Sequence, residues 1–510
     1  MSRVGRNIIY NFAGQGLLLL LGLVAVRFVF RQLGGDALGI IYAAATVSAV
    51  LSGVLELGVS ATIVREVAAK VDSDLGYVRR LIRTASLFYW AAYLLVALVI
   101  FFGAPFFVHR WLLLQSMDPQ TAIGALRILA ISAMVILPRA LYTSVLRGLQ
   151  RMVFNNVIDV SVGALQQLGT IFIITRGGGV LQVAWWFAAC YAAGIVAYLS
   201  LIAGFFSWRA LLPTYSGEVV QRNLRFSSHL MGISLLAAIY TQADKVFVSK
   251  LLPLVTFGYY AFAAGVVSRA TLVTQAIAQA AFPSFSVLMA QGDRPTLQVQ
   301  YRKLHELLSF VTVPIFAGIT FAALPLFSYL FNPSVAHLLL LPTALLCLGW
   351  YMNGTLNVPY VFSLAAGKPE ISSRSNFLAL FIVLPITFVL VLTLGLTGAA
   401  LSWVVYHVWA YAYAIRRICR ECLQLAPATW YAHIARIGAL VAATYGTAFA
   451  LDRLLVPDSI AGIVIAYLLG SLAFAMGGYV LIGDELRESL ARLRHAGRAN
   501  EPRIAPRTGR

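Results

Sequence analysis

The sequence predicts an all-α polytopic membrane protein with about fourteen spanning helices, arranged as two parallel six-helix repeats and two additional helices. Three observations support this fold class: a hydrophobic fraction of 60% with 11% charged residues, long apolar stretches along the whole chain, and an internal repeat. A stretch of about 20 apolar residues crosses a bilayer, and it must be helical because lipid offers no partner for an open backbone. The composition excludes an ordinary soluble domain.

The predicted spans follow one another with short loops between them. They cover residues 7–30, 38–60, 84–107, 121–146, 153–175, 181–206, 227–249, 255–282, 304–328, 336–361, 376–394, 397–415, 430–450 and 459–482. The first span follows Arg3 and Arg6 and continues as a full-length helix without a small-residue cleavage site. It is therefore expected to be an anchor and not a cleaved signal peptide.

Glycines and basic residues recur at a single offset, which is harder to obtain by chance than matches between apolar residues. The pairs are Arg6 and Arg225, Arg31 and Lys250, Gly39 and Gly258, Arg83 and Arg302, Gly148 and Gly367, and Gly179 and Gly398, each 219 positions apart. A shift of six spans preserves direction, so the halves are expected to be parallel repeats about an axis along the membrane normal, with a transport pathway at their interface.

The repeat divides the chain into five predicted parts. They are a first bundle (1–206), a cytoplasmic linker (207–226), a second bundle (227–420), two additional helices (421–483) and a basic cytoplasmic tail (484–510). With the N-terminus in the cytoplasm, most of the 38 Lys and Arg residues fall in inner loops. The positive-inside rule then places both termini in the cytoplasm. The net charge of +19 is explained by these topology signals and by attraction to the anionic inner leaflet, without nucleic acid.

A polar stripe marks the eighth span. Arg269 lies near its middle, and Ser268, Thr271, Gln275 and Gln279 are spaced to share one helical face. Three of the four repeat-related positions in the second span are also polar. Two such stripes predict a central cavity lined from both halves, with Arg269, Thr271 and Gln275 as substrate-binding candidates. The alternative is that these side chains hold helices together by hydrogen bonds.

Ionisable residues also fall inside spans of the first half. Glu56, Arg139 and Asp159 lie in the inner third of the second, fourth and fifth spans, where one base would be shared by two acids. A surplus carboxylate in lipid would bind a proton more readily and could couple transport to a proton gradient. The equally weighted alternative is a buried ion pair that locks the first bundle. His407, in the twelfth span, is either a coupling residue or a packed polar side chain.

Basic residues exceed acidic ones toward the outer face. The cluster comprises Arg27, Arg31, Arg127, Lys245 and Lys250, opposed by Asp36 and Asp244. Long basic side chains at helix ends commonly reach the lipid headgroups, which is the alternative interpretation for most of them. Together with the basic groups inside the spans, this balance favours an anionic substrate over a cationic drug.

No enzymatic motif accompanies these spans. The outer loops are short, and HExxH, GxSxG, P-loop and dinucleotide-binding patterns are absent, so we expect no enzyme and no cofactor. Cys419 and Cys422 form a single CxxC without the second pair that a zinc site needs. No metal site is therefore predicted.

Two segments resemble a known family. Arg31–Tyr42, followed by Glu56–Glu66, resembles the N-terminal signature of polysaccharide flippases, and Gln242–Lys245 continuing to Phe257–Ala261 is similar to the start of that family's helices 7 and 8. These flippases belong to the multidrug/oligosaccharidyl-lipid/polysaccharide (MOP) superfamily. The resemblance covers the first twelve spans by sequence and the last two by span count.

This resemblance implies two six-helix bundles that form a V around a central cavity and work by alternating access. Such proteins, in the bacterial inner membrane, turn undecaprenyl-pyrophosphate-linked oligosaccharides from the inner to the outer leaflet for surface polysaccharide assembly. Arg27 and Arg269 are the positions that match cavity arginines, with Lys245 a further candidate. The implied partners are the lipid-linked anionic oligosaccharide, membrane lipids, a polysaccharide polymerase and glycosyltransferases.

Four other functions remain open from the sequence. A lipid II flippase and a cation-coupled multidrug exporter share the superfamily, although fourteen spans and a basic cavity disfavour the exporter. A membrane-embedded glycosyltransferase or polymerase is disfavoured by the short outer loops. A scaffold for glycan assembly could recruit partners through the basic inner loops.

Overall fold

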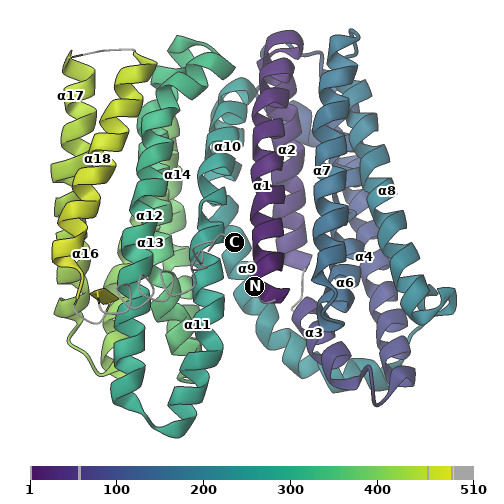
Figure 1. The fold of residues 1–510 in the computed structure, drawn as a ribbon. Coiled ribbons are helices and arrows are strands. Elements are labelled where there is room, and N and C mark those ends of the chain that lie inside the picture. Colours follow the sequence, from purple (N-terminus) through teal and green to yellow (C-terminus); the bar gives the residue numbers. More distant parts are fainter. Residues whose placement is uncertain (1–2, 56–58, 456–458, 484–485, 488–510) are drawn as a thin grey trace, which may run out of the picture. The chain divides into compact units, whose positions relative to one another are not determined.

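The computed structural model describes residues 3–55, 59–455, 459–483 and 486–487, and these residues form long α-helices joined by short loops (Figure 1). The helices are α1 (Arg3–Phe28), α2 (Gly35–Leu55), α3 (Val59–Lys70), α4 (Leu75–Arg110), α5 (Pro119–Ala133), α6 (Ile136–Gly148), α7 (Met152–Thr175), α8 (Val180–Phe206), α9 (Gly217–Leu251), α10 (Leu254–Arg269), α11 (Thr271–Gln291), α12 (Arg294–Leu330), α13 (Pro333–Ala365), α14 (Glu370–Ala410), α15 (Arg416–Ile418), α16 (Pro427–Val441), α17 (Thr447–Leu455) and α18 (Ile460–Leu481). The prediction of an all-α polytopic membrane protein is confirmed.

Twelve helical segments of the described chain are long and apolar enough to cross a membrane. One of them, Glu370–Leu423, covers two predicted spans because α14 is interrupted at Gly395, whose φ of 59° and ψ of −129° favour glycine. The indole of Trp409 donates to the carbonyl of Ser375 at 3.1 Å, so the two parts of α14 run back along each other.

Helix α9, which covers the predicted span 227–249, is 35 residues long and is not among the twelve. The count of fourteen spans therefore stays a prediction.

Helix starts recur at the offset of the sequence repeat. Helices α2 and α10 begin at Gly35 and Leu254, and α4 and α12 begin at Leu75 and Arg294, in both cases 219 positions apart. Local signals fix several of these starts. Asp74, for example, accepts a hydrogen bond from the backbone N–H of Tyr77 at 2.8 Å and caps the N-terminus of α4.

The helices form two compact units that interleave along the chain. Unit 1 contains Met1–Val266, Leu326–Pro342 and Asn376–Ser402, and unit 2 contains Val267–Pro325, Thr343–Ser375 and Trp403–Arg510. In unit 1, α7 packs against both α1 and α8 (Figure 1). A Cβ on Gly14 of α1 would lie 2.7 Å from a side-chain methyl of Val160 on α7, so the missing side chain of the glycine makes room for the valine, as small residues do between membrane helices.

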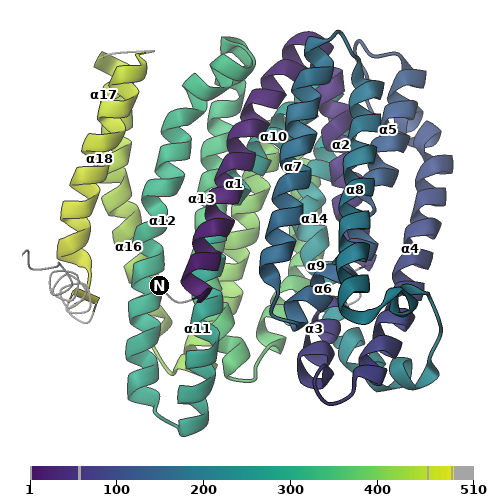
Figure 2. The same ribbon diagram turned by 45° about the vertical axis from the view of Figure 1, so that its right-hand side comes forward.

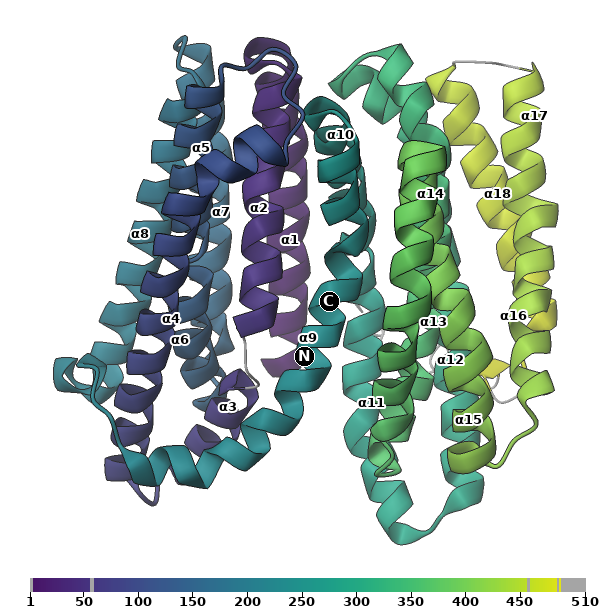
Figure 3. The ribbon, with the colours of Figure 1, turned by 180° about the vertical axis from the view of Figure 1, so that it is seen from behind.

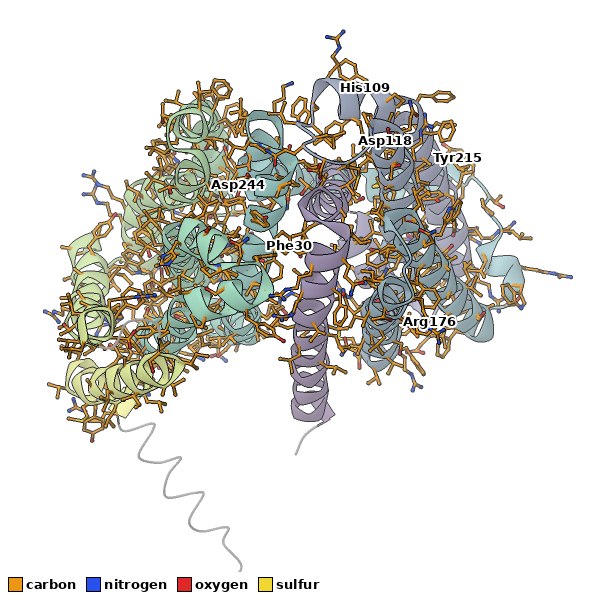
Figure 4. The ribbon with its side chains drawn as sticks, turned by 90° about the horizontal axis from the view of Figure 1, so that it is seen from above. Phe30, His109, Asp118, Arg176, Tyr215 and Asp244 are labelled. Atoms are coloured by element: carbon orange, nitrogen blue, oxygen red, sulfur yellow. The ribbon has the colours of Figure 1, made fainter. Side chains whose placement is uncertain are left out.

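The linker between the repeats is tied to unit 1 by polar contacts. Arg80 of α4 lies 3.9 Å from Glu218 of α9, and the amide of Asn223 donates to the hydroxyl of Tyr77 at 2.9 Å. Figure 3 shows α3, the start of α4 and the first turns of α9 at the same end of this unit. At the opposite end, His109 and Asp118 lie where α4 ends and α5 begins (Figure 4).

In unit 2, the C-terminal helices pack against α12 (Figure 2). The hydroxyl of Tyr467 on α18 donates to the carbonyl of Pro314 at 3.2 Å, and the rings of Phe310 and Phe474 are 5.9 Å apart. The ring of His305 on α12 lies 5.3 Å from that of His433 on α16. The two segments beyond the repeats are therefore an integral part of this unit.

Candidate functional site

Arg139, Asp159 and Tyr198 form a polar cluster in unit 1. They come from α6, α7 and α8. The guanidinium of Arg139 lies 2.6 Å from Oδ2 of Asp159, and the hydroxyl of the fully buried Tyr198 donates to Oδ1 at 2.9 Å. The two charged side chains remain about one-third exposed. The structure thus brings together two of the three residues predicted inside the first bundle, and it supplies a tyrosine that holds the carboxylate.

Glu56, the third member of the predicted triad, lies outside the described residues. Its relation to Arg139 therefore stays a prediction. Asp159 accepts one bond on each carboxylate oxygen, whereas the buried Nε of Arg139 has no hydrogen-bond partner among the described residues.

Arg27 lies against an aromatic ring. Its guanidinium carbon is 3.6 Å from the centre of the Tyr329 ring and its Nη1 donates to the Tyr329 carbonyl. Tyr329 is 61% exposed, so the pair is accessible. Stacking orients a guanidinium while leaving its other donors free for an anionic group.

Lys245 belongs to a more enclosed group. Its Nζ donates to the carbonyl of Thr241 at 2.9 Å and lies 3.8 Å from Oδ1 of Asp244. The other oxygen of Asp244 accepts a bond from the fully buried Tyr260 at 2.6 Å. The charge of Lys245 is thus partly balanced by its neighbour in the chain.

The acidic residue Asp36 is not paired with the outer basic residues. Its Oδ2 accepts bonds from the backbone N–H groups of Gln115, Ser116 and Met117 at 2.9, 2.6 and 2.9 Å. Asp36 is buried, and these three bonds hold the loop between α4 and α5 in place. Arg127, predicted to lie in the outer cluster, contacts the ring of Phe101 at 4.4 Å.

Arg269 lies in unit 2 at a break between two helices. Helix α10 ends at Arg269 and α11 begins at Thr271, while Ala270 is in neither. Arg269 is exposed, and among the described residues its guanidinium has no hydrogen-bond or ion-pair partner. Ala270 keeps helical dihedral angles, with φ of −61° and ψ of −23°, so the break is a local distortion within the helical segment Leu254–Gln291. Arg269 therefore lies inside this segment as an exposed cation.

The remaining residues of the predicted stripe divide into exposed and buried ones. Gln275 and Gln279 are exposed, whereas Thr271 is buried and donates to the carbonyl of Ser268 at 2.7 Å. The hydroxyl of Thr271 therefore stabilises the helix break, and the glutamine amides remain accessible. One turn further, buried Thr274 accepts a bond from the amide of Asn357 on α13 at 3.0 Å.

His407 is enclosed by aromatic rings in unit 2. Its Nδ1 lies 2.7 Å from the carbonyl of Trp403, and the rings of Trp403 and Tyr406 stand nearly perpendicular to it at 4.6 and 4.9 Å. A carbonyl can only accept, so Nδ1 carries the proton. These contacts support the packing interpretation of this residue.

Cys419 and Cys422 are buried and unbridged. Within the described part of the chain, no three His, Cys, Asp or Glu side chains are grouped closely enough to hold a metal ion.

Sequence reasoning missed the tyrosines that complete these clusters. Tyr198, Tyr260 and Tyr329 contact Asp159, Asp244 and Arg27, respectively. Tyr198 follows Asp159 by 39 positions and Tyr329 follows Arg27 by 302, so no local spacing signals these contacts.

Comparison with solved structures defines the class of fold. An inward-facing multidrug resistance MATE family transporter of the MOP superfamily aligns with a TM-score of 0.66 at 15% identity, covering 79% of this chain and 95% of that one. The lipid II flippase MurJ in an inward closed conformation aligns with a TM-score of 0.67 at 15% identity, covering 92% of this chain and 98% of that one. The chain has the fold of MOP superfamily transporters.

Sequence comparison identifies the family. The model of the polysaccharide biosynthesis protein family matches residues 4–289, and the chain belongs to this family. A putative O-antigen transporter of Shigella flexneri is 20% identical over 420 residues, covering 78% of this chain and 93% of that protein. An uncharacterized membrane protein in the cps region of Klebsiella pneumoniae is 23% identical over 248 residues, and the match spans 46% of this chain and only 50% of that protein.

Proposed function

We propose that this protein is a flippase that moves an undecaprenyl-pyrophosphate-linked oligosaccharide from the inner to the outer leaflet by alternating access, for surface polysaccharide assembly. The observation that carries the proposal is the exposed, unpaired guanidinium of Arg269 at a helix break, in a chain of the polysaccharide biosynthesis protein family. An unpaired cation near the middle of the bilayer costs at least ~2.5 kcal/mol, so a compensating anion is expected. A pyrophosphate provides charge-assisted bonds that suit a planar guanidinium.

We assign further residues to substrate binding according to how accessible their side chains are. Gln275 is exposed one turn beyond the break, and its amide offers donors and acceptors to sugar hydroxyls. Arg27, held against Tyr329, supplies a second oriented guanidinium. We assign Lys245 a weaker contribution, because Asp244 already offsets its charge, and Thr271 an indirect one, through the shape of the break.

The proposed orientation places both termini in the cytoplasm of a bacterial inner membrane. It rests on the positive-inside distribution of Lys and Arg. In this orientation the first turns of α4, with Arg79, Arg80 and Arg83, and the helical segment with Arg416, Arg417 and Arg420 face the cytoplasm. These basic segments would also be available to glycosyltransferases and, through lipid contacts, to the inner leaflet.

The Arg139–Asp159 pair is proposed to hold the first bundle together, with Glu56 as the residue that carries a coupling proton. Asp159 is bonded by both Arg139 and Tyr198, and Glu56 would be the surplus carboxylate. Replacing Glu56 with Gln should impair transport more than folding. Normal transport in Glu56→Gln at every external pH would remove the coupling role.

The function can be tested by complementation of a strain that lacks its O-antigen flippase. The protein should restore surface polysaccharide, measured by gel electrophoresis of extracted lipopolysaccharide. Two parallel assays address the other candidates: rescue of a strain depleted of its lipid II flippase, and resistance to cationic dyes. Dye resistance without restored polysaccharide would contradict the proposal.

A lipid II flippase is the second candidate. The observation that favours it is the alignment with MurJ, which covers 92% of this chain, compared with 79% for the multidrug transporter of similar TM-score. Both lipid-linked substrates carry a pyrophosphate, so the role of Arg269 is the same in either case. Rescue of lipid II flippase depletion without restored O-antigen would decide for this second function.

A further inference from the structure

A cavity of about 440 Å³ lies within unit 1, and none of the residues assigned to the substrate lines it. It is formed where the linker begins after α8. Its lining residues are Trp90, Tyr142, Leu199, Trp208, Arg209, Leu211, Leu212 and Pro213. The cavity therefore has contributions from α4, α6, α8 and the linker.

One wall of the cavity is fixed by hydrogen bonds between the linker and α4. Arg83 donates from Nε to the carbonyl of Leu212 at 3.1 Å and from Nη2 to the hydroxyl of Thr214 at 2.6 Å. The hydroxyl of Thr84 donates to the Thr214 carbonyl at 3.1 Å, and the Thr214 N–H donates to the Arg83 carbonyl at 3.3 Å. Four bonds hold this segment, so the cavity is built before any ligand arrives.

The cavity is polar at one end and apolar at the other. At the deep end, the indole of Trp90 donates to the hydroxyl of the buried Tyr142 at 3.0 Å, which satisfies the single polar atom of the Trp90 ring. Trp90 is seven residues beyond Arg83, or about 10 Å along the helix axis. At the mouth, Trp208 and Arg209 are exposed, and the Arg209 guanidinium has no partner among the described residues.

We propose that this cavity binds an anionic phospholipid of the cytoplasmic leaflet, with its phosphate at Arg209 and part of an acyl chain against Trp90 and Leu199. The leaflet assignment rests on the orientation given under the proposed function. A guanidinium at the interface suits a phosphate, and an exposed tryptophan suits the headgroup level. The apolar deep end excludes a free phosphate as the whole ligand. A bound lipid would hold the linker between the two repeats in place.

Fluorescence quenching by brominated lipid tests this proposal without any transport assay. Purified full-length protein is titrated in mixed micelles with brominated phosphatidylglycerol or brominated phosphatidylcholine. The Trp208 signal is isolated as the difference between the parent protein and Trp208→Phe. We expect phosphatidylglycerol to quench Trp208 at a lower mole fraction than phosphatidylcholine. Because micelles have no leaflets and the readout is fluorescence, failure of the flippase proposal or of the orientation would leave this result unchanged.

Two variants and one control make the test specific. Arg209→Gln should raise the mole fraction of phosphatidylglycerol for half-quenching about fivefold, as expected for the loss of one basic contact with an anionic lipid. Leu199→Trp, which fills the apolar end while retaining the charge, should also weaken quenching of Trp208. Arg151→Gln changes an exposed arginine that does not line the cavity and should leave the titration unaltered. Gel filtration verifies that each variant remains folded.

Two results would overturn the proposal. Equal quenching by both lipids, unaffected by Arg209→Gln, would show that the cavity does not select an anionic lipid. Displacement of brominated phosphatidylglycerol by a stoichiometric amount of undecaprenyl phosphate would assign the cavity to the substrate lipid instead.

Discussion

Gly39 and Gly258, which occupy equivalent positions in the two repeats, pack backbone against backbone in unit 1. A Cβ on Gly258 would lie 2.9 Å from the nitrogen of Gly39 and 3.0 Å from its Cα. Each glycine is the fifth residue of its helix, since α2 begins at Gly35 and α10 at Leu254. Equivalent positions of the two repeats are thus in direct contact, and the Gly258 position leaves no room for a side chain.

The first prediction concerns this contact. Gly258→Ala should destabilise the protein by about 1–3 kcal/mol, because the new methyl group meets rigid backbone and overpacking costs that much. The measurement is the thermal unfolding midpoint of the purified protein in detergent. Gly265→Ala is the matched control on the same helix, since a Cβ there meets nothing within 4 Å. If both variants unfold at the wild-type temperature, the close approach is incorrect.

The second prediction concerns the Arg139–Asp159 pair. Arg139→Ala and Asp159→Ala should each lower stability, and the double variant should lose less than the sum, because each single change leaves one charge unpaired. Partial exposure of both side chains limits the expected coupling to about 1–2 kcal/mol. Tyr198→Phe should cost about 1.5–3 kcal/mol, as a bond to a charged group is lost. Additive effects in the double variant would show that the two residues do not interact.

The third prediction concerns the loop that follows α4. Asp36→Ala should release residues 115–117, because three backbone N–H groups lose their common acceptor. A cysteine at Gln115 should then react faster with a water-soluble maleimide than it does in the parent. Asp118→Ala, which removes only the cap of α5, is the control and should change this rate little. An unchanged rate in Asp36→Ala would count against the contact.

The fourth prediction tests the proposed orientation. Single cysteines at Asp72 and Lys368 should be protected from membrane-impermeant maleimide in intact spheroplasts and should react after permeabilisation. A cysteine at Asp118 should react in intact spheroplasts. The basis is the charge asymmetry of the loops. Labelling of Asp118 only after permeabilisation would invert the topology.

The fold class and the family could be predicted because both depend on patterns that can be recognised in the sequence without knowing the tertiary structure. Apolar length identifies spans, and the offset from Gly39 to Gly258 identifies the repeat. Helix interruptions were harder to locate. The break at Ala270 lies inside one predicted span, and neither a glycine nor a proline marks it.

The polar clusters could be predicted only in part. Arg139 and Asp159 lie within ion-pair distance, and the sequence suggests this contact because charges in a membrane require partners. The third predicted member of this cluster, Glu56, lies outside the described residues. The same reasoning predicts Asp36 opposite basic side chains, whereas its Oδ2 accepts bonds from backbone N–H groups of a loop 79 or more positions away. Every residue except proline has a backbone N–H group, so the sequence does not show which of these groups will bond to a given carboxylate. Tyr329, which orients Arg27, is distant in sequence for the same tertiary reason.

The most direct test of the account is flipping of a pyrophosphate-linked oligosaccharide in proteoliposomes. Wild-type protein should make a fluorescent undecaprenyl-pyrophosphate oligosaccharide accessible to an external glycan-cleaving enzyme faster than empty vesicles do. Arg269→Ala should lose this activity, Arg269→Lys should retain part of it, and Arg176→Ala, an exposed arginine outside the candidate site, should match wild type. If the wild-type rate equals that of empty vesicles while the same vesicles transport a cationic dye, the assignment of the substrate is wrong.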